Sequence, residues 1–182
     1  MSVPFIEDLI AADMRAVDAV IRRRLNSEVA LVSQVAEYIV GSGGKRLRPA
    51  LVVLSAGALG YQGDQHHQLA AVVEFIHTAT LLHDDVVDAS ELRRGNATAN
   101  ALFGNAASVL VGDFVYSRAF QMMVEVQSMR VMQVLADATN VAFIVAKWLG
   151  NKGANQFEHL ILRVLTGANG IPALTFRAVP IQ

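Results

Sequence analysis

Hydrophobic side chains follow a helical repeat along most of the chain. From Ile6 to Leu25 they recur every three or four residues opposite a polar face, which predicts an amphipathic helix. Similar patterns predict further helices, from Ser27 as N-cap to about Val40, from Pro49 to about Gly60, from Ala106 to Val126 and from Met129 to Val141. No longer stretch alternates strictly between apolar and polar residues, and the usual hairpin turn signals are missing. The pattern predicts an all-α fold.

The segment from Leu69 to Asp88 differs from the others because its apolar residues cover nearly the whole circumference of a helix. Such a helix is expected to be buried on all sides, with Asp64 as a candidate cap before it. Its end nevertheless carries three carboxylates, Asp84, Asp85 and Asp88. Because burying ionised carboxylates without partners is costly, we expect a cation at this end.

The spacing of the three acids indicates which of them act together. At about 100° per residue, Asp84 and Asp88 share a face with His77, and Asp85 is turned away in a supporting position. Two oxygen ligands one turn apart suit Mg²⁺, which keeps several waters and takes its remaining ligands from substrate phosphates. An isolated pattern of this kind is more often a solvated helix end, but the apolar run before it and the arginines after it favour a metal site.

Composition and charge narrow the class of protein. The 182 residues are 53% hydrophobic, carry a net charge of −1 and include no cysteine. These values fit one helix-rich domain in a reducing compartment and argue against general nucleic-acid binding. Charged or strongly polar residues interrupt every long apolar stretch, and the acidic N-terminus lacks the pattern of a signal peptide. We therefore expect a cytoplasmic protein without a transmembrane segment.

Two short basic clusters flank the predicted central helix. Lys45, Arg46 and Arg48 follow a glycine-rich loop, and Arg93 and Arg94 follow the acidic end of the helix. Either cluster alone is more often a solvated basic patch. Combined with the three carboxylates, they predict a site for a metal-bridged diphosphate and a second anion. For His77, a hydrogen-bonded core position and a phosphate contact both remain open.

Several motifs in this order and spacing resemble the trans-polyprenyl diphosphate synthases, and in particular the long-chain branch of that family. The resemblance covers about residues 1–141. The matching segments are GGKRLRP at 43–49, EFIHTATLLHDDVVD at 74–88, RRG at 93–95, ATAN at 97–100 and GDF at 112–114.

The resemblance implies an isoprenoid-synthase-type helical bundle, of which this chain holds the N-terminal part, and a homodimer for the intact family member. It implies that Asp84 and Asp88 hold Mg²⁺ on an allylic diphosphate contacted by Arg93. The remaining residues implied to bind substrate, here isopentenyl diphosphate, are Lys45, Arg48, His77 and Arg94. A growing product held at the two aspartates would pass Ala79 and Thr80, one turn below, which makes these small residues candidates for setting product length.

The resemblance ends after Val141. The family's later motifs, including a second aspartate-rich one, are missing from residues 142–182. Residues 1–141 carry 11 basic and 15 acidic side chains, whereas residues 142–182 carry four basic and one acidic. We expect residues 142–182 to be a frameshifted or otherwise replaced tail, with a divergent docking segment as the alternative.

Three functions remain open on this basis. The first is a prenyltransferase that elongates an allylic diphosphate with isopentenyl diphosphate to a long-chain, octaprenyl-like product for quinone side chains. The second is a noncatalytic substrate-binding or partner subunit of an intact synthase. The third, a terpene cyclase, also uses paired aspartates but has no need for a second-substrate site made by Lys45, Arg48 and Arg94.

Overall fold

The computed structural model describes residues 4–41 and 44–149, with side chains from residue 6 to residue 140. The chain divides after Gln127 into two compact units, Met1–Gln127 and Ser128–Gln182. The all-α prediction is confirmed, since the regular elements among the described residues are helices apart from one two-stranded ribbon. No helix among the described residues combines the length and the apolar character that crossing a membrane requires.

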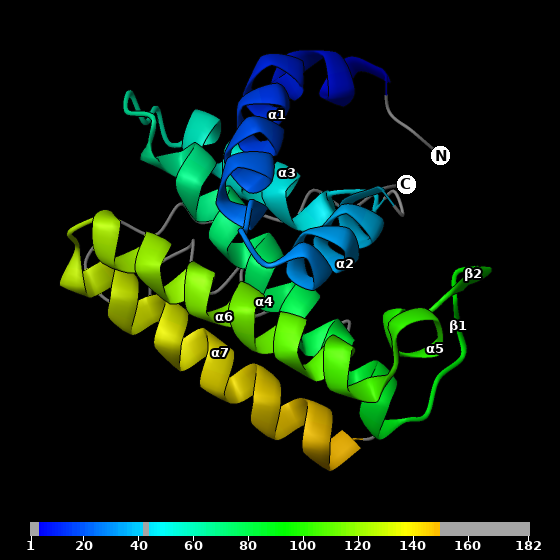
Figure 1. Ribbon diagram of the computed structural model, residues 1–182. Coiled ribbons are helices and arrows are strands. Elements are labelled where there is room, and N and C mark those ends of the chain that lie inside the picture. Colours follow the sequence, from blue (N-terminus) through cyan, green and yellow to red (C-terminus); the bar gives the residue numbers. More distant parts are fainter. Residues whose placement is uncertain (1–3, 42–43, 150–182) are drawn as a thin grey trace, which may run out of the picture. The chain divides into compact units, whose positions relative to one another are not determined.

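The first unit is organised around α4 (Gln65–Val87), which packs against α1, α3 and α6 (Figure 1). Seven consecutive residues, Ala70 to Ile76, are buried. Seven residues span nearly two helical turns, so this part of α4 is enclosed on all sides, as its sequence predicts. The expectation fails at Val87, whose side chain is 82% exposed, because the burial of α4 ends at Asp85.

The helices before α4 lie close to their predicted positions. They are α1 (Pro4–Leu25), α2 (Ala30–Gly41) and α3 (Leu47–Ala58). Pro49 lies in the first turn of α3, where its missing amide hydrogen removes no helical hydrogen bond. Ser27 accepts a hydrogen bond from the Val29 amide at 3.2 Å, but α2 begins only at Ala30. Asp64 occupies the N-cap position of α4 without a capping bond from its side chain.

The segment after α4 contains a hairpin that the sequence analysis did not predict. Strand β1 (Leu92–Arg93) pairs with β2 (Asn96–Ala97) in antiparallel register. The two residues between them, Arg94 and Gly95, have φ angles of 54° and 84°. A tight type I′ hairpin turn requires both central residues to be left-handed, and its usual sequence is Asn-Gly or Asp-Gly. Arg-Gly lacks that signal, so the prediction was wrong here.

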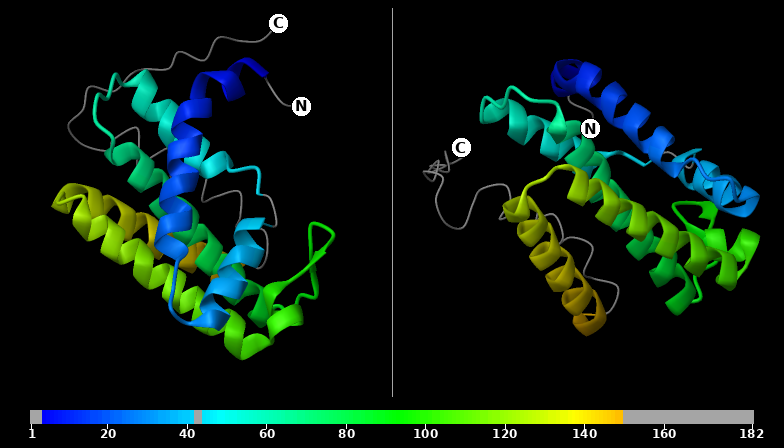
Figure 2. Two further views of the ribbon diagram at one scale, coloured as in Figure 1. Left: turned by 45° about the horizontal axis from the view of Figure 1, so that its top comes forward. Right: turned by 60° about the vertical axis from the view of Figure 1, so that its left-hand side comes forward.

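A short helix, α5 (Ala99–Phe103), follows the hairpin directly. Both views of Figure 2 show the hairpin and α5 beside the C-terminal end of α4. The structure therefore adds two small elements next to the acidic end of the central helix.

The α4–α6 contact overturns one further expectation. In α6 (Asn105–Glu125), the buried Ser108 hydroxyl donates to the Leu82 carbonyl at 3.0 Å. Because Asp113 lies within the strongly apolar segment 106–126, its side chain would be expected to be buried, but it is 67% exposed and lies 3.3 Å from the His83 ring. The reason is rotational: Gly112 is the residue turned toward α4, and the next position points about 100° away.

The second unit contains α7 (Met129–Leu149) in its described part. Ser128 precedes the helix as predicted, with its hydroxyl accepting from the Val131 amide at 3.3 Å and its carbonyl accepting from the Met132 amide at 3.0 Å. The helix continues beyond its predicted end at Val141. The segments 151–153 and 167–170, whose asparagine and glycine residues predict breaks in any long helix, lie outside the described residues.

Candidate substrate and metal site

One face of α4 forms the floor of a pocket in the first unit. Glu74, Thr78, Leu81 and Asp85 follow one another at intervals of four, three and four residues, so they share a face, and His77 lies beside them. The rest of the lining comes from the loop before α3 and the first turn of that helix, from the hairpin, and from residues of α2 and at the start of α5. The pocket contains all five predicted substrate-binding residues, Lys45, Arg48, His77, Arg93 and Arg94, whereas Asp84 and Asp88 lie outside its lining. The two basic clusters, which lie 45 residues apart in the sequence, thus meet at one site.

Arg46 fixes the first basic segment to α4. Its guanidinium donates to the Glu74 carboxylate at 2.8 Å and lies 3.7 Å from Asp18 of α1. Arg46 also adopts a left-handed conformation with φ 47° at the N-cap of α3. Because Glu74 is only 8% exposed, its charge requires this partner. Arg46 is therefore a positioning residue that holds Lys45 and Arg48 at the pocket.

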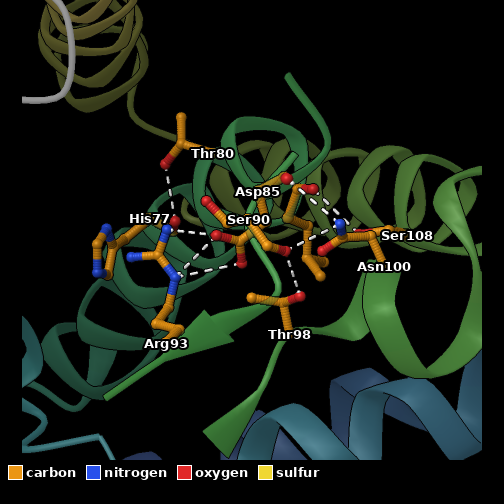
Figure 3. A network of polar contacts seen from close by, with 9 residues as sticks. His77, Thr80, Asp85, Ser90, Arg93, Thr98, Asn100 and Ser108 are labelled. Carbon is orange, nitrogen blue, oxygen red and sulfur yellow. Dashed lines mark hydrogen bonds and ion pairs between the residues drawn. The ribbon is translucent and has the colours of Figure 1, made fainter. Parts of the chain in front are cut away.

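A second ion pair fixes the hairpin. Arg93 donates to the Asp85 carboxylate at 2.6, 3.1 and 3.2 Å through two of its nitrogens, as Figure 3 shows. The Asp85 side chain is 6% exposed, whereas that of Arg93 is 36% exposed. Asp85 is thus occupied by Arg93, and the outer side of Arg93 remains accessible to an anion.

Main-chain oxygens beside Asp85 hold the base of the same hairpin (Figure 3). The Ser90 carbonyl accepts from the Thr98 hydroxyl at 2.6 Å and from the Asn100 side-chain amide at 3.1 Å. That amide also lies 3.3 Å from the Asp85 carbonyl. These bonds connect the end of α4 to the start of α5, so the orientation of Arg93 and Arg94 depends on both.

His77 lies between the two basic segments. Burial lowers the pKa of His77 to about 3, and the charges of Arg48, Arg93 and Arg94 contribute in the same direction. The imidazole is therefore neutral at physiological pH and retains one N–H donor. The positive charges of these three arginines act together at the pocket, and this electrostatic field favours the binding of an anion there.

Asp84 and Asp88 lie one turn apart at the end of α4. The Asp88 amide donates to the Asp84 carbonyl at 2.8 Å, which keeps the helical relation between them, and Asp88 is the C-cap residue. Burial raises the pKa of Asp84, and the charge of Asp88 raises it further. A carboxylate whose ionised form is disfavoured, with a second carboxylate one turn away, gains from a divalent cation, so these two oxygen ligands suit the predicted Mg²⁺.

The two candidate chain-length residues occupy other faces of α4. Ala79 is 1% exposed, and the Thr80 hydroxyl donates to the carbonyls of His77 and Ile76 at 2.7 and 3.0 Å. Neither belongs to the lining of the pocket above. Their role in product length stays a prediction.

Sequence reasoning missed the roles of Glu74 and Arg46. The available signal was an acid inside the longest apolar stretch of the chain, which requires a cationic partner at that depth. Its partner stands 28 residues earlier, and periodicity within one helix cannot identify it.

A pocket bordered by two basic segments, beside paired carboxylates at the end of a buried helix, defines a candidate diphosphate and metal site. The model that represents the polyprenyl synthetase family matches residues 29–144, and the chain belongs to that family. The fold is accordingly the N-terminal part of the all-α isoprenoid-synthase fold.

Individual relatives agree with the long-chain branch. The octaprenyl diphosphate synthase of Escherichia coli (strain K12) is 59% identical over 141 residues, 78% of this chain and 44% of the relative. The corresponding enzyme of Haemophilus influenzae is 55% identical over 141 residues, 78% of this chain and 43% of the relative. The chain therefore spans less than half the length of these curated relatives.

Solved structures show the same partial coverage. A polyprenyl synthase from Caulobacter crescentus CB15, complexed with calcium and isoprenyl diphosphate, matches with a TM-score of 0.74 and 50% identity, over 78% of this chain and 43% of the other. A decaprenyl diphosphate synthase from Rhodobacter capsulatus matches with a TM-score of 0.72 and 46% identity, over 88% of this chain and 50% of the other.

Proposed function

We propose that this chain supplies the N-terminal substrate-binding part of a Mg²⁺-dependent, long-chain trans-prenyltransferase. The observation that carries the proposal is the meeting of both basic segments at one pocket on α4, next to the Asp84 and Asp88 pair. The Caulobacter relative, complexed with calcium and isoprenyl diphosphate, supports a site for a divalent cation and a diphosphate.

The chemistry requires two diphosphate substrates. The allylic C–O bond breaks and diphosphate leaves, the double bond of isopentenyl diphosphate forms the new C–C bond, and a proton is lost. Mg²⁺ held by Asp84 and Asp88 would neutralise charge on the leaving diphosphate. Arg93 binds that diphosphate, and Lys45, Arg48, His77 and Arg94 bind isopentenyl diphosphate.

The fixed positions of these cations are what the fold contributes. Glu74 and Asp85 hold the two basic segments before substrate arrives, so little reorganisation is needed when the anions bind. Apolar residues of the pocket, such as Leu81 and Leu82, limit the access of water to the reacting carbons.

Binding of an allylic diphosphate analogue to the purified chain tests the site. Calorimetric titration is expected to detect binding with Mg²⁺ and a loss of about 100-fold or more in affinity for an Asp84→Asn, Asp88→Asn double variant, equal to about 2.7 kcal/mol. An exposed-acid control, Asp8→Asn, is expected to bind like the parent chain. Equal affinity in EDTA would refute the metal-bridged site.

Turnover tests the reaction class. We expect the 182-residue chain alone to be nearly inactive, and a hybrid that joins residues 1–141 to the remaining part of an octaprenyl diphosphate synthase to elongate allylic diphosphates. A hybrid that consumes the allylic substrate without isopentenyl diphosphate would favour a cyclase. Ordinary turnover by the isolated chain would contradict our assignment of residues 142–182 as a replaced tail, which rests on their composition and on the family match ending at 144.

The same hybrid tests the chain-length residues. Ala79→Phe is expected to shorten the product to about 15 to 20 carbons while the first condensation continues. The reason is that the aromatic ring would fill space that a longer product needs. Chromatography of labelled products measures this. An unchanged product would place the growing chain on another face of α4.

A noncatalytic partner subunit is the second candidate. The observation that favours it is a 34% identical relative named heptaprenyl diphosphate synthase component 2, from Geobacillus stearothermophilus. For that candidate, the chain would bind an intact synthase in sedimentation experiments and change the synthase's rate without any turnover of its own.

For the catalytic assembly we propose a homodimer that is located in the cytoplasm. Its long-chain product would supply the side chains of quinones.

A further inference from the structure

Three side chains of types that can bind a metal ion lie close together, far from the diphosphate pocket. Asp13 of α1 faces His66 and His67, in the first turn of α4. The Asp13 carboxylate oxygen lies 2.8 Å from Nε2 of His67 and 3.5 Å from Nε2 of His66. Within the described part of the chain, this is the group of three such side chains whose ligand atoms all lie within 4.8 Å of one another. The cluster therefore connects two separate helices, α1 and α4, which Figure 1 labels.

The distances match the requirements of a metal site. Four ligands at roughly 2.0 to 2.1 Å from a tetrahedral zinc ion stand about 3.3 Å from each other. The two Asp13–histidine separations, 3.5 and 2.8 Å, bracket that value, so binding an ion requires movements of a few tenths of an ångström. The two imidazole rings are 3.9 Å apart between centroids and turn the same nitrogen toward Asp13.

The exposure of the three side chains is also favourable. Asp13 is 39% exposed, which leaves a path for an ion and for water ligands, while His66 and His67 are 15% and 20% exposed. The rings are thus held in place, and the carboxylate closes the site from the neighbouring helix.

The choice of ion follows from the ligands. Two imidazoles and one carboxylate suit zinc and similar transition-metal ions, whereas Mg²⁺ selects oxygen ligands. His66 precedes Asp84 by 18 residues, about 27 Å along a helix, so the cluster is separate from the diphosphate site.

We propose that Asp13, His66 and His67 form a binding site for a divalent transition-metal ion of the zinc type, with water completing the coordination. The ion connects α1 to the beginning of α4. It stabilises the docking of the N-terminal helix on the core and takes no part in the transfer reaction.

The test is metal analysis of the full chain without an affinity tag. Protein mixed with Zn²⁺ in excess Mg²⁺, which occupies oxygen-ligand sites, is passed through gel filtration and analysed for metal. One retained equivalent of zinc is expected, with a rise of about 5 °C in the melting temperature. His67→Gln and Asp13→Asn are expected to lose both effects, whereas Asp8→Asn, which removes a carboxylate of α1 outside the cluster, is expected to keep them.

Cobalt provides a readout that does not depend on variants. Co²⁺ bound to two imidazoles in a site of low symmetry is expected to give a visible absorption band that zinc displaces. Circular dichroism in EDTA shows whether the variants still fold. Zinc-free parent protein after gel filtration, or equal zinc in parent and His67→Gln, would overturn the proposal.

Discussion

The two basic segments of the pocket are built alike but exposed differently. Each is fixed by one arginine to a buried carboxylate of α4, and the two carboxylates, Glu74 and Asp85, stand 11 residues or about 16 Å apart on one face. The Arg46 side chain is 19% exposed, whereas that of Arg93 is 36% exposed. Arg46 therefore acts as an internal support, and Arg93 combines support with the ability to bind substrate.

The largest effect is expected from Arg46→Met. The substitution leaves the buried Glu74 carboxylate without its partner, which should lower the free energy of unfolding by about 3 to 5 kcal/mol. Urea unfolding followed by circular dichroism measures the loss, with Arg22→Met on the exposed side of α1 as control. Combining Arg46→Met with Glu74→Gln should recover part of the stability. Losses that simply add would show that the ion pair is not the cause.

Much of this arrangement can be predicted from the sequence. The central helix, its acids and the flanking arginines stand out because helical periodicity relates residues up to about four positions apart. The partners of Arg46 and the exposure of Asp113 depend on contacts between separate helices, which local patterns do not encode. The hairpin was missed because Arg94 adopts a left-handed conformation, which is uncommon for arginine and could not be predicted from its residue type.

His77 lies between the two segments, and acid is expected to reveal its environment. The folded-state pKa of about 3 lies below the usual histidine pKa of 6.5, so the unfolded chain binds the proton first as the pH falls. Stability is complete above about pH 6.5 and decreases toward pH 3, by about 2 kcal/mol at pH 5. His77→Gln should remove this part of the pH dependence in urea unfolding measured from pH 8 to pH 5. An unchanged dependence would mean that His77 is readily protonated in the folded protein.

Breaking the second ion pair should cost less than breaking the first. Asp85→Asn leaves Arg93, which water can reach, so we expect a loss of about 1 to 2 kcal/mol in the free energy of unfolding. Hydrogen exchange should show the change concentrated in the hairpin, for example at the Thr98 amide, which donates to the Glu91 carbonyl at 2.9 Å. A loss as large as that of Arg46→Met would remove the distinction between the two arginines.

The smallest effect on stability is expected at Lys45, for which no ion pair with Glu74 or Asp85 is described above. Lys45 is exposed at the pocket, so Lys45→Ala should leave stability within about 0.5 kcal/mol of the parent chain. Affinity for isopentenyl diphosphate should fall about tenfold, as expected for one lost charge contact of about 1.4 kcal/mol. Calorimetry of Lys45→Ala against Arg23→Ala, an exposed residue of α1, checks this. Equal affinities would place the diphosphate away from the first segment.

The left-handed turn at Arg94 implies a trade-off between robustness and activity. A residue other than glycine or asparagine is strained there by about 1 kcal/mol, and this chain accepts that strain at a position whose charge faces the pocket. Selection for thermal tolerance alone should therefore replace Arg94 with asparagine or glycine and make the hairpin more rigid. Selection for substrate binding should keep the arginine. The residue found at this position in evolved variants would therefore indicate whether stability or substrate binding was selected more strongly.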